Sequence, residues 1–257
     1  MSNKKNVAFY IFFIVAIALA ITIYFIPFNI FNNENYDKFL KDIFIRLIVI
    51  AILVVVAFLF GLKNQLYFKS PRKKDLPIII SAFFVAMVNF PLHAIVVGTA
   101  KITDIYACFL LATDCIVVAM TEELFFREIL YESIKERTVE KKNAVFFRVI
   151  ISAVAFSLFH LLNLLSGASI GATMLQVAYT FLLGCLFATL KEVTTSIWYG
   201  TIVHAIFNFG GNVVTYAGSG QFQDNVFWIA TITMGLIAGV ITFITIIRET
   251  KSINYNK

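Results

Sequence analysis

Apolar stretches of about 20 residues, the length that crosses a bilayer as a helix, recur along this chain of 257 residues. Inside lipid every backbone amide must find its partner within the protein, so such stretches favour helices. The stretches lie at approximately 7–28, 43–62, 76–97, 103–126, 145–165, 172–190, 195–216 and 226–247. They predict an all-α, polytopic membrane bundle of about eight transmembrane helices. Residues 1–257 are expected to form a single membrane domain.

Composition supports lipid as the solvent of this chain. Hydrophobic residues make up 60% of the sequence and charged residues 14%, and the mean hydropathy is +0.87. Soluble domains are about 45 to 50% apolar and about 25% charged. The chain has 21 Lys and Arg against 15 Asp and Glu. The positions of these residues relative to the spans matter more than the net positive charge, and no nucleic-acid partner is expected.

Basic residues gather at alternate connections between the expected spans. With eight spans, most of the 21 Lys and Arg residues fall on the side of the N-terminus. This count places Arg127 and Arg148 in the connection between spans 4 and 5, and Lys191 in the connection between spans 6 and 7. The asymmetry predicts that both termini are cytoplasmic. The short chain favours a prokaryotic cell membrane.

Six polar side chains from three separate spans lie at membrane depth. They are Glu122, Glu123 and Arg127 near the end of the span 103–126, His160 in the span 145–165, and His204 and Asn208 in the span 195–216. A charged side chain at the bilayer centre costs at least about 2.5 to 3.5 kcal/mol on insertion scales. Such groups normally face the bundle interior and pair with one another or line a wet cavity. We therefore expect a site inside the bundle.

The spacing of the charged residues predicts different roles for the adjacent carboxylates of Glu122 and Glu123. Glu123 and Arg127 are four residues apart, so they share a helical face and can form an ion pair. Glu122 lies about 100° around the helix and stays free for chemistry. For Glu122 to reach the depth of the histidines, the helix must continue to about Glu132 or Lys135. The residues after Arg127 include no Gly or Pro, which favours this extension.

Three short motifs follow one another along the chain, each on its own span. They are Glu-Glu-x-x-x-Arg (Glu122, Glu123, Arg127), Ser-x-x-x-Phe-x-x-x-His (Ser152, Phe156, His160) and His-x-x-x-Asn (His204, Asn208). Taken in order, they resemble the CAAX prenyl endopeptidase and bacteriocin-processing (Abi) family of intramembrane proteases. The resemblance covers a core at about residues 115–212.

The resemblance implies an endopeptidase that hydrolyses a peptide bond of a membrane-associated or lipidated peptide or protein, with membrane lipid as its surroundings. Glu122 and His160 would hold and deprotonate a water, and His204 and Asn208 would stabilise the oxyanion. The supporting residues would be Glu123, Arg127 and Phe156. A carboxylate that is partly desolvated suits a general base. Donors fixed on a helix face suit an oxyanion hole.

A zinc mechanism is an alternative for the same residues. Glu122, His160 and His204 would supply three ligands and leave a fourth position open. The sequence has no HExxH motif, however, and Asn208 fits a hydrogen-bond donor better than a ligand. We therefore favour a site without a metal or other cofactor.

Other function classes fit less of the sequence. A non-catalytic scaffold or bacteriocin-immunity protein on the same fold would not need Glu122 and both intramembrane histidines. A proton-coupled transporter usually shows paired repeats and broken helices, and neither is evident. Prenylated carboxyl termini, pheromone precursors and bacteriocin leaders all fit the family as substrates. Asp114 and His93 receive no role.

Overall fold

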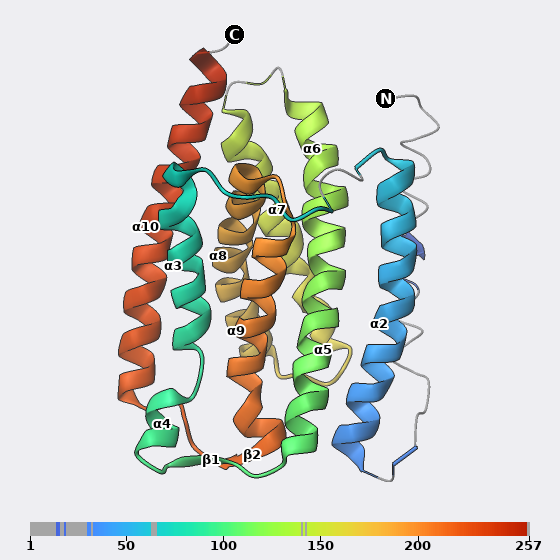
Figure 1. The fold of residues 1–257 in the computed structure, drawn as a ribbon, viewed down its shortest axis with the longest axis vertical. Helices are drawn as coiled ribbons and strands as arrows, with labels where there is room; N and C mark the ends of the chain where they lie inside the picture. The colour runs from blue at the N-terminus through green and yellow to red at the C-terminus, as the bar shows by residue number, and fades with distance from the viewer. Residues whose placement is uncertain are drawn as a thin grey trace.

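The computed structural model describes residues 14, 15, 18, 30, 31, 33–62, 66–139, 141 and 143–255. These residues form a helical bundle closed at one end by a short antiparallel ribbon (Figure 1). The α-helices are α2 (Glu34–Leu59), α3 (Leu76–Val88), α4 (Leu92–Val96), α5 (Ile105–Glu123), α6 (Tyr131–Thr138), α7 (Ala144–Phe159), α8 (Ile170–Thr194), α9 (Trp198–Ala217) and α10 (Asn225–Tyr255). The other elements are the 3₁₀ turns η2 (Lys73–Asp75) and η4 (His160–Leu164), the π-helix η3 (Leu124–Leu130), and the strands β1 (Ala100–Ile102) and β2 (Gly218–Gly220).

Five helical segments of the described chain are long and apolar enough to cross a membrane. They are Glu34–Leu59, Ile105–Thr138, Ala144–Leu164, Ile170–Thr194 and Asn225–Ser252. An all-α membrane bundle therefore fits, as the apolar stretches predicted. The expected span 7–28 lies outside the described residues except for 14, 15 and 18. Neither α3 nor α9 is among the five, so the count of eight stays a prediction.

The expected span 76–97 is not one helix. It is broken between α3 and α4, where Asn89 ends the first helix and Pro91 precedes the second. Proline has no backbone N–H and its ring clashes with the preceding turn, which explains the break. The Asn89 side chain then donates to the backbone carbonyl of Phe207 on α9 at 2.7 Å. The break therefore fastens α3 to the middle of the bundle.

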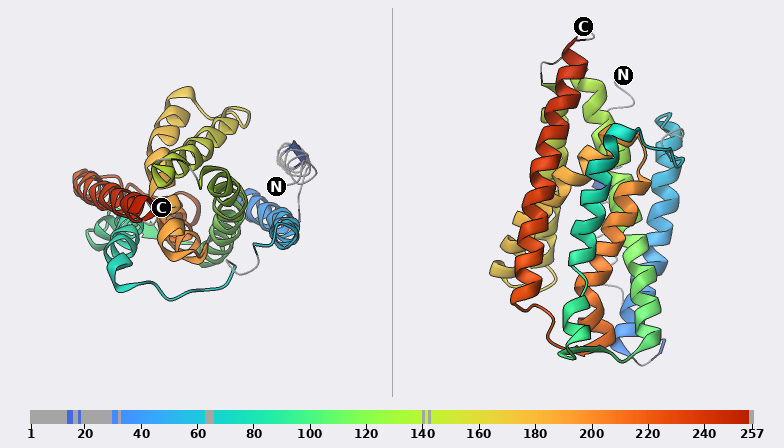
Figure 2. Two further views of the ribbon diagram at one scale, coloured as in Figure 1. Left: turned by 90° about the horizontal axis from the view of Figure 1, so that it is seen from above. Right: turned by 60° about the vertical axis from the view of Figure 1, so that its left-hand side comes forward.

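The central helix of the bundle is α9. It packs along both α5 and α3, and it also contacts α8. The view from above places it among these helices, with α2 and α10 farther out (Figure 2). Helix α7 packs chiefly on α8, and α2 packs on α5. Polar side chains on α9 are thereby kept from lipid.

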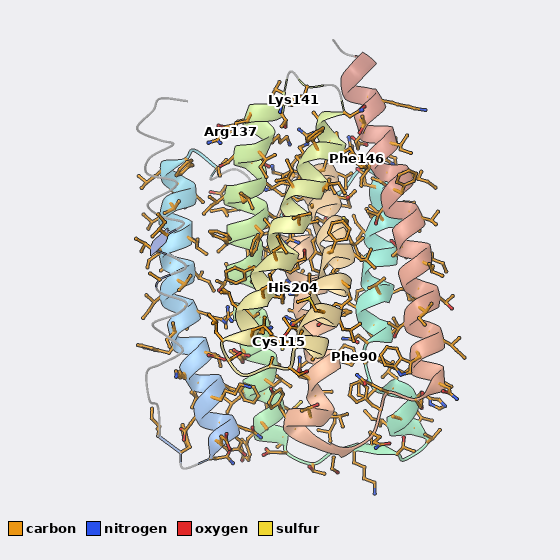
Figure 3. All side chains as sticks on the ribbon, turned by 180° about the vertical axis from the view of Figure 1, so that it is seen from behind. Phe90, Cys115, Arg137, Lys141, Phe146 and His204 are labelled. Carbon is orange, nitrogen blue, oxygen red and sulfur yellow. The ribbon has the colours of Figure 1, made fainter. Side chains whose placement is uncertain are left out.

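The connection that leads into α3, the connection between α6 and α7 and the end of α10 all lie at one end of the bundle (Figure 1). Arg137 and Lys141 are labelled at this end in Figure 3. Their position agrees with the predicted charge asymmetry. Which end faces the cytoplasm stays a prediction.

Three basic residues expected in connections are instead buried inside helices. Arg127 is 0% exposed, Lys191 1% and Arg148 2%. The reason is helix length: Ile105–Thr138 is one continuous helical segment that includes η3, and α8 runs on to Thr194. The predicted extension of the helix beyond Arg127 is thereby confirmed.

The buried basic residues have acidic partners on neighbouring helices. Lys191 Nζ lies 2.6 Å from Glu128 Oε2 and 3.7 Å from Glu132 Oε1. Arg148 pairs with Glu192, which also accepts a hydrogen bond from the Tyr131 hydroxyl at 2.7 Å. Their partners offset much of the cost of removing these charges from water. This network ties η3 and α6 to α7 and α8.

The Lys191–Glu128 pair gives a test of this packing. Lys191→Met leaves the carboxylate of Glu128 buried without its partner, and we expect a loss of about 3 to 5 kcal/mol of stability. Unfolding in detergent by heat and by denaturant measures it. The double variant Lys191→Met, Glu128→Leu should recover most of the loss, and Lys251→Met, on an exposed position, should be neutral. A double variant as unstable as Lys191→Met alone would contradict the pairing.

Candidate active site

His204 on α9 lies in the interior of the bundle, between its two ends (Figure 3). The residue is only 4% exposed. Its Nε2 atom lies 3.7 Å from Glu122 Oε2, and its Nδ1 atom lies 3.4 Å from Glu123 Oε1. The last two residues of α5 therefore place a carboxylate oxygen near each nitrogen of one imidazole, at ion-pair distance and without a hydrogen bond among the described residues.

The ion pair expected between Glu123 and Arg127 is present. Arg127 Nε lies 3.4 Å from Glu123 Oε2. The guanidinium carbon lies 4.2 Å from the ring centroid of Phe156 and 5.4 Å from that of Phe187. Aromatic faces attract a desolvated cation, so the rings help to keep Arg127 in place. Glu123 is thus shared between a fixed cation and His204.

His160 begins the 3₁₀ turn η4, directly after α7 ends. Its Nδ1 atom lies 2.9 Å from the backbone carbonyl oxygen of Phe156. A carbonyl can only accept, so Nδ1–H is the donor and Nε2 carries the lone pair. No hydrogen bond or ion pair joins His160 to Glu122 within the described part of the chain. In this conformation the carboxylate of Glu122 faces His204 instead.

Phe156 connects the two intramembrane histidines. Its ring centroid lies 5.0 Å from that of His160 and 5.8 Å from that of His204, with both contacts edge to face. Asn208 lies one turn beyond His204 on α9 and is half-buried. The structure therefore gathers side chains from the three sequence motifs into one region of the bundle.

Two residues outside these motifs complete the surroundings of His204. A Cβ atom on Gly200 would lie 2.7 Å from Glu123 Oε2, so the missing side chain admits this carboxylate to the backbone of α9. The ring of Phe187 on α8 stacks on His204, with centroids 5.1 Å apart and planes 27° apart. Gly200 lies four residues before His204, and this spacing is the signal by which the sequence could have placed both on one face. Nothing distinguished Phe187 among 28 phenylalanines.

The zinc set considered above is not assembled in this arrangement. Among the described residues, no group of three His, Cys, Asp or Glu side chains is placed to hold a metal. Glu122 and His204 contact each other, while Nδ1 of His160 donates to a carbonyl. We therefore derive no step through a metal ion.

His93 and Asp114, the two polar residues without a predicted role, have no hydrogen bond or ion pair with His204 among the described residues. His93 Nδ1 lies 2.7 Å from Asp224 Oδ2 and joins α4 to the start of α10. The backbone N–H of Phe227 and the side chain of His93 donate to Asp224 and lower the pKa of its carboxyl. Asp114 has one buried carboxylate oxygen without a hydrogen bond to the residues that the structure describes.

Comparison with known proteins supports the predicted resemblance. Residues 104–210 match the family model described as "Type II CAAX prenyl endopeptidase Rce1-like". No curated protein and no solved structure matches the chain. The matched residues run from the start of α5 into α9 and include all three motifs. The chain is thus an integral membrane protein that carries, over residues 104–210, the signature of the Rce1-like type II CAAX prenyl endopeptidases.

Proposed function

We propose that this protein is an intramembrane endopeptidase that uses Glu122, His160, His204 and Asn208 to hydrolyse a peptide bond of a lipidated or membrane-associated substrate. The observation that carries the proposal is the placement of a buried imidazole between two adjacent carboxylates. In hydrolases such a contact lets a proton pass between the acid–base groups during one turnover.

The first step is attack by water on the scissile carbonyl carbon. The lone pair of His160 Nε2 accepts one proton of the water in a hydrogen bond, and Glu122 removes the other. The oxygen then forms a bond to the carbonyl carbon, and the carbonyl oxygen takes up the electron pair. Asn208 donates to this oxyanion through its side-chain amide.

The second step returns the proton to the leaving nitrogen. Glu122 passes it to Nε2 of His204, which it contacts at 3.7 Å. The carboxylate of Glu123, 3.4 Å from Nδ1, compensates the positive charge that the ring then carries. The Nε2–H group donates to the oxyanion and then protonates the nitrogen as the C–N bond breaks. The products are a carboxylic acid and an amine, so atoms and charge balance.

The matched family and the membrane position of the site support a lipidated peptide as the substrate. A peptide that ends in a prenylated CaaX sequence would keep its lipid chain among the apolar helices and bring a peptide bond to His204. The site lies inside a bundle whose outer surface is apolar. A peptide with an S-farnesylated CaaX end is therefore the probe for the experiments below.

Glu122→Gln removes the proposed base while keeping the size of the side chain. We expect cleavage of the farnesylated peptide to fall by about 10²- to 10⁴-fold. Release of the carboxyl-terminal tripeptide, measured by mass spectrometry on purified protein of equal amount, checks this. Glu136→Gln, on an exposed position of α6, is the matched control and should cleave normally. Normal cleavage by Glu122→Gln would refute the mechanism, and a wild-type protein that binds without cutting would favour a scaffold.

Gly200→Ala tests the contact between Glu123 and His204. The added methyl group displaces the carboxylate, and we expect kcat to fall by about 10²-fold, the usual cost of a misplaced group. Glu123→Asp shortens this side chain, so the double variant should recover part of the loss. Gly239→Ala, which meets no atom within 4 Å, is the control. If the double variant is slower than Gly200→Ala, the steric explanation is wrong.

Metal removal separates the two mechanisms for the same residues. Under the proposed mechanism, incubation with a zinc chelator followed by gel filtration leaves turnover of the farnesylated peptide unchanged. Elemental analysis of the active protein should give far less than one metal ion per chain. Activity that is lost with the metal and returns with added Zn²⁺ would replace the proposed mechanism.

A further inference from the structure

Three polar side chains beside the site belong to none of the motifs. They are Asn163 on η4 and Gln176 and Tyr179 on α8, all within membrane-length segments. None of the three is buried, and Tyr179 is 39% exposed. Polar groups at membrane depth are costly unless they pair or line a wet cavity. Their exposure indicates contact with something other than lipid.

The three side chains form a connected group. Asn163 Nδ2 donates to Gln176 Oε1 at 2.7 Å. Tyr179 lies three residues after Gln176 on α8, so the two side chains share one face of the helix. The group therefore bridges the 3₁₀ turn after α7 and the first half of α8.

This group lies next to two elements of the proposed site, the turn that carries His160 and the helix that carries Asn208. In a 3₁₀ helix residues i and i+3 eclipse, so Asn163 lies on the same face of η4 as His160. The ring of Tyr179 lies 6.2 Å from that of Phe207, the neighbour of Asn208. A ligand on these side chains would be held next to the reacting groups.

The chemistry of the group matches a peptide backbone. The bond between Asn163 and Gln176 uses one donor and one acceptor and leaves the Asn163 carbonyl oxygen and the Gln176 NH₂ group. An acceptor beside a donor is what the N–H and C=O of an extended peptide require. The amides carry no charge, so they do not select a phosphate, a carboxylate or a metal ion.

We propose that Asn163, Gln176 and Tyr179 form a subsite for the main chain of the substrate next to the scissile bond. Asn163 accepts from a substrate N–H, and Gln176 donates to a substrate C=O. Tyr179, on the same face of α8, borders the subsite on the side of Phe207. The proposal rests on the endopeptidase function above and names how that site holds a peptide.

The experiment compares two farnesylated peptides that differ in one backbone atom. In the second peptide an ester replaces the amide next to the scissile bond, which removes one N–H group. Binding is measured by competition against a fluorescent farnesylated peptide on Glu122→Gln protein, so the result does not depend on turnover. We expect the ester to bind this protein about tenfold more weakly than the amide.

Replacement of the acceptor should abolish this difference. In the Asn163→Leu background both peptides should bind with the same affinity, equal to that of the ester for the parent protein. The reason is that the substitution and the ester remove the same hydrogen bond. Gln176→Met should weaken both peptides by a similar factor. Gln223→Leu, on an exposed residue of the connection before α10, is the control and should keep the tenfold preference.

The outcomes separate this inference from the proposed function. A tenfold preference that persists in Asn163→Leu, or no preference in the parent protein, would mean that the amides only fasten η4 to α8. In a protein that keeps Glu122, the substitution Gln176→Met should raise KM for cleavage while kcat stays within about twofold of the wild-type value. If the parent protein shows no ester effect while Glu122→Gln abolishes cleavage, the subsite is overturned and the catalytic proposal stands. Normal cleavage by Glu122→Gln overturns the catalytic proposal instead.

Discussion

The contact of His204 with the two carboxylates at the end of α5 is the constraint around which the bundle is arranged. Removing ionisable groups from water is tolerable only when they meet partners, so α5 and α9 must lie close together. Gly200 gives Glu123 the room to reach α9, and Phe187 and Phe156 fix the planes of His204 and Arg127. The aromatic side chains thus hold the polar side chains in position.

A second group of buried charges performs a different task. Lys191, Arg148 and their acidic partners lie nearer to the end of the bundle that holds the basic connections, and they tie α6, α7 and α8 to one another. This network fixes α8, which carries both Phe187 and the proposed peptide subsite. The π-helix η3 joins the two groups, since it follows Glu123 directly and contains Arg127 and Glu128. π-helical segments are frequent at functional sites.

Part of the proposed site was predictable because its signals are local. The spacing of Glu123 and Arg127 correctly indicated an ion pair, and the lack of Gly and Pro after Arg127 correctly indicated a longer helix. Other features depend on partners far along the chain. Lys191 looked like a connection residue until its buried partner Glu128 was known. Pro91 interrupts a stretch that hydropathy alone reads as one span.

The sequence by itself determined the membrane class, most of the helices and the order of the motifs, because apolar length and four-residue spacing are properties of single segments. Only the tertiary structure decided that Glu122 faces Nε2 of His204 while Glu123 faces Nδ1. It also decided that Gly200 leaves room for Glu123, that Phe187 stacks on His204 and that Asn163 pairs with Gln176. These contacts join different helices, and helix crossing is set by the packing of whole surfaces, which no single segment encodes.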